Sequence, residues 1–157
     1  THSGIERVAI LDFDVHHGNG SVAMFQDDPR VLVCSSFQHP FYPGRYEDVV
    51  RPHIVNTPLP AGTGSAAFRA AIARDWLPAL EQHRPDLVFV SAGFDAHRAD
   101  PLAELELDET DFDWITREIV AVAARHAAGR VVSTLEGGYD LAALARSVAA
   151  HLEALAD

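Results

Sequence analysis

Short apolar runs alternate with longer helical patterns along the chain. Each run is bounded by turn or charged residues, a pattern typical of a strand buried in a sheet. The runs predict strands at residues 7–13, 31–36, 86–91 and 130–135, with a short helix at residues 21–26. Alternating strands and helices favour parallel pairing, because a crossover helix returns the chain to the same end of the sheet.

Three longer segments have the apolar spacing of amphipathic helices: residues 65–83, residues 108–127 and a last segment after Gly137-Gly138. Pro78 is expected to bend the first of them. Their apolar faces consist of Phe68, Ile72, Trp76 and Leu80 in the first helix, Phe112, Ile115, Ile119 and Val122 in the second, and Leu141, Leu144, Val148 and Leu152 in the third.

The segment between the second predicted strand and the first long helix has a different composition. Residues 38–64 hold five of the nine prolines, which predicts a long loop with a short strand near residues 53–56. Long ordered loops in compact domains often have a function, so this segment is a candidate part of a site.

Together these elements predict a single α/β domain of three layers, with a central parallel sheet between helices. A chain of 157 residues, 48% of them apolar, is long enough for one domain with a substantial core. In such sheets ligands bind just beyond the carboxyl ends of the strands. Residues that carry chemistry are therefore expected in the loops that follow strands.

The charge of the chain excludes some partners. Twelve Lys and Arg stand against 23 Asp and Glu, and the formal net charge of −11 disfavours direct binding to nucleic acid or to an anionic membrane. No apolar run is long enough to cross a membrane, and the first residues do not have the form of a signal peptide. Cys34, the one cysteine, lies in an apolar run, so we expect a buried thiol in a cytoplasmic protein.

The densest chemistry follows the first predicted strand, in the stretch Asp12-Phe-Asp-Val-His-His-Gly-Asn-Gly20. Residues two apart in an extended chain share a face, so Asp14 and His16 can point at one metal ion while Val15 points away. A carboxylate with an imidazole suits zinc or ferrous iron. His17 faces away from His16 and is expected to be a structural hydrogen-bond partner.

Two further strand ends add polar residues, in the stretches 92–102 and 136–140. Catalytic zinc takes three protein ligands and leaves a position for water, so Asp100 or His97 is expected to complete the set. Asp95 is expected only to fix its loop through backbone amides. Tyr139, on its Gly-Gly turn, could donate a hydrogen bond to a carbonyl that the metal polarises, which suits amide hydrolysis. The remaining histidines, including His151 on the last helix, are expected to be solvated or are unassigned.

In order and spacing, these three loops resemble the superfamily of histone deacetylases, acetylpolyamine amidohydrolases and acetoin-utilisation proteins. The stretches that carry the resemblance are 12–20, 91–97 with 100–102, and 135–139, and the variants Asn19 and Glu136 are similar to the class II and bacterial branches. The likeness spans nearly the whole chain and implies an arginase/deacetylase-like fold.

The resemblance implies that Asp14, His16 and Asp100 hold one zinc ion per chain, which decides between Asp100 and His97. It also implies that Tyr139 stabilises the transition state and that Asp12 orients a catalytic histidine. A structural potassium ion is implied beside Asp12, Asp14, His16, Ser36 and Phe37, and a second monovalent site at the carbonyls of Phe25, Asp28 and Val31. A narrow tunnel for an acyl-lysine-like arm is implied along Phe41, Tyr42, Leu107 and Gly138.

One departure from the family concerns its tandem catalytic histidines, which lie in a Gly-His-His motif upstream of the first metal ligand and are absent here. The resemblance therefore implies that residues 1–157 are the carboxyl-terminal part of a single deacetylase-like catalytic domain, with an incomplete sheet. Loss of a positioned base is expected to lower activity by about 10²- to 10⁴-fold. An exposed sheet edge is expected to pair with the missing amino-terminal segment or with another copy of the chain.

The sequence thus predicts a zinc-dependent amidohydrolase that removes an acetyl group from an acetyl-lysine-like or acetylpolyamine substrate, with the chain alone weakly active or inactive. One alternative is an arginase-type dimanganese hydrolase, suggested by the Asp95-Ala96-His97 sequence. Another is a non-catalytic or truncated fragment, suggested by the missing histidines. The acidic charge favours a cationic amine without deciding between a protein lysine, a polyamine and another small amide.

Overall fold

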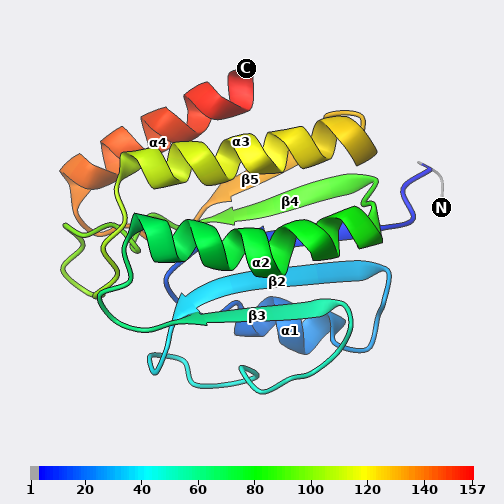
Figure 1. Cartoon of the computed structure of the whole chain (residues 1–157), viewed down its shortest axis with the longest axis horizontal. Helices are drawn as coiled ribbons and strands as arrows, with labels where there is room; N and C mark the ends of the chain where they lie inside the picture. Colours follow the sequence, from blue (N-terminus) through cyan, green and yellow to red (C-terminus); the bar gives the residue numbers. More distant parts are fainter. Residues whose placement is uncertain (1–3) are drawn as a thin grey trace.

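The computed structural model describes residues 4–157 and has one five-stranded sheet flanked by helices (Figure 1). The elements are β1 (Val8–Asp12), α1 (Asn19–Phe25), β2 (Val31–Gln38), β3 (Ile54–Leu59), α2 (Ser65–His83), β4 (Leu87–Ala92), α3 (Glu109–His126), β5 (Val131–Leu135) and α4 (Leu141–Ala156). All neighbouring strands pair in parallel, in the order β3-β2-β1-β4-β5. The predicted α/β class and parallel sheet are confirmed.

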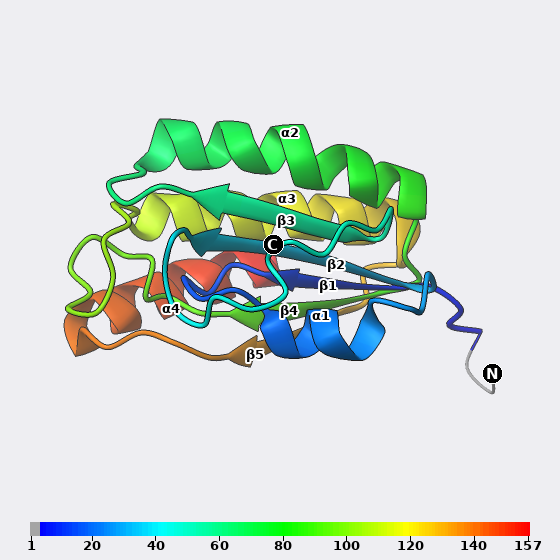
Figure 2. The ribbon, with the colours of Figure 1, turned by 90° about the horizontal axis from the view of Figure 1, so that it is seen from below.

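The helices cover the two faces of the sheet unequally (Figure 2). The main core lies between the sheet and helices α2 and α3, and includes Leu11, Trp76 and Ile115. A smaller core of Val22, Val33 and Ile54 lies on the other face, beneath α1. Helix α4 packs beside α3, at the β5 end of the sheet.

The largest difference from the predicted elements is β3. The sequence predicts a short strand within a loop, whereas the structure has a six-residue strand that includes Pro58. Proline lacks a backbone donor, but a strand at the edge of a sheet has one side without a ladder, so Pro58 is tolerated there. The other elements differ from their predicted bounds by a few residues, and Pro78 lies inside α2.

Two smaller predictions concern the burial of Cys34 and the length of apolar segments. Cys34 is buried, as predicted, and its burial raises the pKa of the thiol. Among residues 4–157, no helix combines the length and the apolar composition that crossing a membrane requires.

Candidate active site

Three loops meet at the carboxyl ends of the strands, on the left in Figure 1. They follow β1, β4 and β5, which are neighbours in the sheet. The backbone N–H of Phe94 donates to the carbonyl of Gly137 (2.7 Å), and the N–H of Gly137 donates to Asp14 Oδ2 (3.0 Å). The loops that the sequence singled out therefore form one site.

Asp14, His16 and Asp95 converge in this site, with one ligand atom of each within 4.8 Å of the others. His16 Nδ1 lies 2.8 Å from Asp14 Oδ1 and 3.3 Å from Asp95 Oδ2. Asp95 is fully buried, and its Oδ2 atom accepts no well-aligned hydrogen bond. An imidazole nitrogen with two carboxylates is a donor set that suits zinc. Within residues 4–157, three such side chains come together only here.

The electrostatics of these side chains also favour a cation. The hydrogen bond to Asp14, and after it the nearby carboxylate of Asp95, raise the pKa of His16 to about 10. Burial raises the pKa of Asp95. Burial acts in the same direction on Asp14, but bonds from His16 and from the Gly137 N–H together lower the pKa of that carboxyl. Two carboxylates thus share one buried position, and a positive charge between them relieves their repulsion.

The group that the structure brings together contains Asp95, and Asp100, the predicted third ligand, is not part of it. Metal binding by Asp100 stays a prediction. Asp100 Oδ1 accepts from the Leu102 N–H (2.9 Å), and Asp100 Oδ2 accepts from the Tyr139 N–H (2.8 Å). Asp100 therefore ties its own loop to the backbone of Tyr139. Asp95 does bond a backbone amide, that of Val15 (2.8 Å), but through Oδ1, so its Oδ2 stays free for the cluster.

Tyr139 lies beside the three carboxylates. Partial burial and the negative charges of Asp95, Asp14 and Asp100 raise the pKa of its phenol. The side chain is 51% exposed, while its backbone is tied to Asp100. A raised pKa keeps the Tyr139 phenol protonated at neutral pH, so it is able to donate a hydrogen bond.

Asp12 is buried next to the cluster and accepts from the Asp14 N–H through Oδ1 (3.1 Å). Burial, with the negative charges of Asp14 and Glu136, raises the pKa of Asp12 well above its usual value. A hollow of about 300 Å³ borders Asp12 and is also lined by Ser91 and Glu136. Asp12 is thus a buried carboxyl that faces a space large enough for a further side chain.

The packing around the carboxylates requires glycine at two positions. A Cβ atom on Gly137 would lie 2.6 Å from Asp14 Oδ2, and one on Gly93 would lie 2.6 Å from Asp14 Cα. Real Cβ atoms do not approach other atoms so closely, so a side chain at either position would displace Asp14.

The residues predicted to line a tunnel are only partly placed together. Phe41 stacks on the His16 ring (centroids 5.3 Å apart), and Tyr42 meets the same ring edge-on (6.0 Å). Gly138 follows Gly137 with a φ of 140°. Leu107 is 1% exposed and belongs to the main core, and its place in a tunnel stays a prediction.

The residues predicted to hold monovalent cations lie in two regions. Ser36 and Phe37 are buried near the carboxyl end of β2. In the second region, the Phe25 carbonyl accepts from the N–H of Asp28 (2.9 Å) and lies 3.2 Å from His53 Nε2, and the Asp28 carbonyl accepts from the Val31 N–H (3.1 Å). Cation binding at either place stays a prediction.

Two other histidines test the sequence interpretation. His17 is a structural partner, as predicted, because its Nε2 lies 2.8 Å from Asn56 Oδ1 and its ring packs on Phe37. His151 was expected to be solvated, but it is 3% exposed and lies between Thr116 and Ser133.

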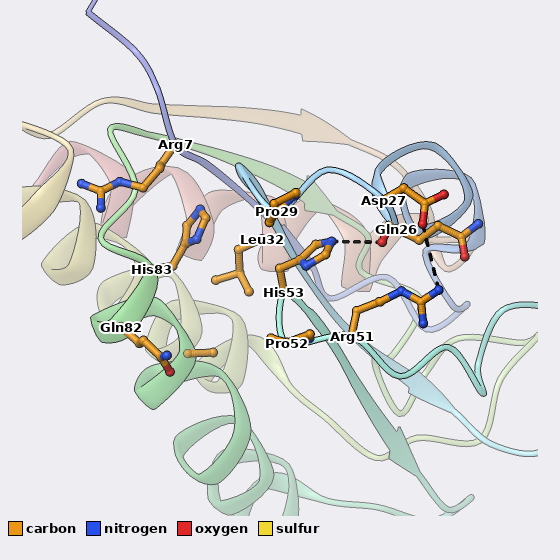
Figure 3. Close-up of a pocket in the computed structure, with 11 residues that line it drawn as sticks. Arg7, Gln26, Asp27, Pro29, Leu32, Arg51, Pro52, His53, Gln82 and His83 are labelled. Atoms are coloured by element: carbon orange, nitrogen blue, oxygen red, sulfur yellow. Dashed lines mark hydrogen bonds and ion pairs between the residues drawn. The ribbon is translucent and has the colours of Figure 1, made fainter.

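A larger cavity, of about 580 Å³, lies at the opposite end of the strands. Figure 3 shows its lining residues, among them Arg7, Leu32, Arg51, His53 and His83. Its two imidazoles already contact backbone carbonyls: His53 that of Gln26 (3.1 Å) and His83 that of Val8 (3.0 Å). In the part of the chain that the structure describes, it holds no cluster of potential metal ligands. The chemistry of the residues therefore indicates the smaller hollow, and not the larger cavity, as the candidate site.

Comparison with known proteins agrees with the motifs. The chain is 42% identical over 158 residues to an uncharacterized protein of Synechocystis sp., an alignment that covers 99% of this chain and 50% of that protein. It is 44% identical over 143 residues to the histone deacetylase-like amidohydrolase of Pseudomonas aeruginosa, covering 87% of this chain and 38% of that one. The crystal structure of the HDA15 HD domain superposes with a TM-score of 0.90 at 33% identity, over 98% of this chain and 45% of that chain.

This chain therefore spans half or less of each of these proteins. The histone deacetylase domain, as a sequence family, matches residues 1–155. With the family's loops gathered around Asp14, His16 and Asp95, and with a match over nearly all its residues, the chain belongs to the histone deacetylase domain family.

Proposed function

We propose that this chain is the metal-binding part of a zinc-dependent deacetylase that removes an acetyl group from an acetyl-lysine-like or acetylpolyamine amide. The observation that carries the proposal is the convergence of Asp14, His16 and Asp95 beside the phenol of Tyr139. The Pseudomonas relative, an amidohydrolase by name, supports the reaction class.

Asp14, His16 and Asp95 are the residues that we propose as the zinc ligands. They supply one nitrogen and two carboxylates, which makes the three protein ligands typical of catalytic zinc and would leave a fourth position for water or substrate. When bound, the zinc ion supplies a Lewis acid that polarises an amide carbonyl and acidifies water. Asp100 takes the supporting role of holding the Tyr139 backbone in place.

Tyr139 stabilises the negative charge that develops on the carbonyl oxygen of the substrate. Its raised pKa keeps the phenol protonated, so it donates a hydrogen bond as the oxyanion forms. Phe41 and Tyr42, packed on the His16 ring, provide an apolar wall for the methylene arm of an acyl-lysine or acetylpolyamine. The formal charge of −11 favours a cationic amine as the product.

Proton transfer needs a base that the described residues do not place at the cluster. Asp12, next to the hollow of about 300 Å³, is positioned to accept a hydrogen bond from an imidazole brought there by another polypeptide segment. We therefore propose that the chain alone is weakly active or inactive. Structural potassium, beside Asp12 and the end of β2, would further neutralise the buried carboxylates.

The two alternatives are weaker on specific grounds. A dimanganese hydrolase needs a second set of ligands next to the first, and residues 4–157 bring three potential ligands together at one place only. A purely non-catalytic role does not explain why the Oδ2 atom of Asp95 is buried without a hydrogen bond. That role would gain support if the chain bound zinc but stayed inactive after the remaining part of a deacetylase domain was supplied.

Zinc titration of the metal-free chain, with elemental analysis of the saturated protein, tests the ligand set. We expect one zinc per chain, an affinity at least about 100-fold lower in Asp95→Ala, and an affinity within about tenfold of wild type in Asp100→Ala. The reverse ranking would restore Asp100 as the ligand. In a complex supplied with the remaining domain, Tyr139→Phe should lose about 10²-fold in deacetylation of an acetyl-lysine peptide while keeping its zinc.

A further inference from the structure

Strand β3 contains an asparagine whose side chain contacts two separate loops. Asparagine is depleted in strands, because its amide can hydrogen-bond to the nearby backbone and so competes with strand pairing. Asn56 nevertheless lies inside β3, where its Oδ1 atom is 2.8 Å from His17 Nε2 and its Nδ2 atom bonds three backbone carbonyls. An asparagine with these tertiary partners indicates a role beyond sheet pairing.

The Nδ2 atom of Asn56 holds the loop that precedes β3. Residues 40–50 form the wall loop, which includes the aromatic residues of the predicted tunnel wall, and none of them is fully buried. The carbonyls that accept from Asn56 Nδ2 are those of Tyr46 (3.2 Å), Glu47 (3.1 Å) and Val49 (3.4 Å). Within residues 4–157, the other hydrogen bonds that reach the wall loop from outside come only from the flanking residues His39 and Arg51. Asn56 is therefore the main hydrogen-bonded attachment of the wall loop to the sheet.

These contacts fix which way the amide of Asn56 is turned. Carbonyl oxygens only accept hydrogen bonds, so Nδ2 must face the wall loop and Oδ1 must face His17. The Oδ1 atom also only accepts, so Nε2 of His17 carries a proton and donates it. The other ring nitrogen of His17, Nδ1, is buried and has no hydrogen-bond partner in the part of the chain that the structure describes. The His17 side chain thus depends on Asn56 for its hydrogen bonding.

His17 directly follows His16, the imidazole that we propose as a metal ligand. The ring of His16 stacks on Phe41 of the wall loop (centroids 5.3 Å apart) and meets Tyr42 edge-on (6.0 Å). Asn56 therefore holds both the loop that carries these aromatic rings and the residue next to the imidazole on which they pack.

We propose that Asn56 is a positioning residue that fixes the wall loop relative to His16, and with it the entrance for the methylene arm of the substrate. Loss of its donor group should let the wall loop open without unfolding the sheet, because no fully buried side chain holds that loop. Asp14 and Asp95 should stay in place, since they accept from the Gly137 and Val15 N–H groups. The role in substrate binding rests on the proposed function, whereas the attachment of the loop can be tested without it.

Trypsin cleavage after Arg45, an exposed residue of the wall loop, measures how readily the loop opens. Asn56→Asp keeps an oxygen for His17 but replaces the donor by an oxygen that repels the carbonyls, so cleavage after Arg45 should be at least about tenfold faster than in wild type. Thr57→Val is the matched control, because it removes a hydrogen bond from the adjacent β3 residue to Asp75 Oδ2 (3.1 Å). Cleavage after Arg45 in this control should stay within about twofold of wild type. Equal cleavage in Asn56→Asp and wild type, or equally faster cleavage at every arginine, would overturn the attachment.

Nitrogen NMR of the His17 ring tests the contact on the other side of Asn56. We expect the ring proton on Nε2 in both wild type and Asn56→Asp, because both side chains present an acceptor oxygen to it. A proton on Nδ1 alone in wild type would overturn the link between Asn56 and the metal loop.

Kinetics separate positioning of the substrate from general damage. In a complex supplied with the remaining domain, Asn56→Asp should raise KM for an acetyl-lysine peptide about tenfold and change kcat less than about threefold, with zinc content unchanged. A fall in kcat at unchanged KM would overturn the role in substrate positioning. If the wild-type complex bound zinc but did not deacetylate the peptide, the proposed function would fail, and the cleavage experiment would still decide whether Asn56 holds the wall loop.

Discussion

The two ends of the strands carry polar residues of different kinds. At the carboxyl ends, buried carboxylates converge on one imidazole and are packed so tightly that Gly93 and Gly137 have no room for a Cβ. At the amino ends, the larger cavity is lined by arginine and histidine side chains, and both of its imidazoles contact backbone carbonyls. Unsatisfied buried groups and crowded charges distinguish the candidate active site, whereas the cavity of larger volume lies at the other end of the strands.

The largest effect is expected when a methyl group is added at Gly137, near the carboxyl ends of the strands. Gly137→Ala should lower zinc affinity by about 10³-fold, equivalent to about 4 kcal/mol, because the new Cβ displaces both Asp14 and Asp95. Competition with a chromophoric chelator measures this affinity. Gly20→Ala is the control, since no atom lies within 4 Å of a Cβ at that helical position, and its zinc affinity should be unchanged. Equal affinities in the two variants would show that the packing around Gly137 is not required.

A smaller effect is expected from acid, through a histidine packed beneath the loops of the site. His151 contacts the rings of Phe13 and Phe94, and its burial lowers the pKa of the imidazole from 6.5 to about 4. Between pH 6.5 and about 4, the His151 imidazole is therefore protonated in the unfolded chain but neutral in the folded protein. This contribution to stability is complete above pH 6.5 and falls as the pH decreases from 6.5 to 4, by about 3 kcal/mol.

Urea unfolding at pH 7.5 and pH 4.5 measures this loss. His151→Gln removes the titrating group, so the variant should lose about 2 to 3 kcal/mol less than wild type over the same interval. An identical loss in the two proteins would assign the acid sensitivity to the carboxylates of the site.

The smallest effect is expected at the amino-end cavity. His83→Gln keeps a donor near the Val8 carbonyl, so the free energy of unfolding should change by less than about 1 kcal/mol and zinc affinity should stay the same. A loss of zinc affinity in this variant would break the contrast between the two ends, because it would couple the cavity to the metal site.

Much of the fold follows from local patterns in the sequence. Strands β1, β4 and β5 and helices α2, α3 and α4 lie close to their predicted positions. The spacing of apolar residues in each segment reflects whether one or both of its faces are buried. β3 is the exception, since Asn56 and Pro58 resemble loop residues. Their strand depends on pairing with β2, which residues 54–59 do not encode by themselves.

The site could be predicted by location but not in full detail. The carboxylates and histidines after strands indicated which loops meet, yet Asp95 and Asp100 lie on one loop, and the local pattern does not say which of them lies next to Asp14 and His16. The choice depends on contacts with distant segments: Val15 N–H bonds Asp95 across 80 residues of sequence, and Tyr139 N–H bonds Asp100 across 39. The buried state of His151 depends in the same way on Thr116 and Ser133.

The amino-acid sequence alone determined the order of strands and helices, the parallel class of the sheet and the loops in which the chemistry lies, because side-chain periodicity and strand ends are local properties. Only the tertiary structure decided that Asp95 joins Asp14 and His16, that Leu107 is in the core and that β3 and β5 are the edge strands. These outcomes depend on which distant segments pack together, and hydrogen bonds between such segments select one carboxylate orientation among several that the local sequence allows.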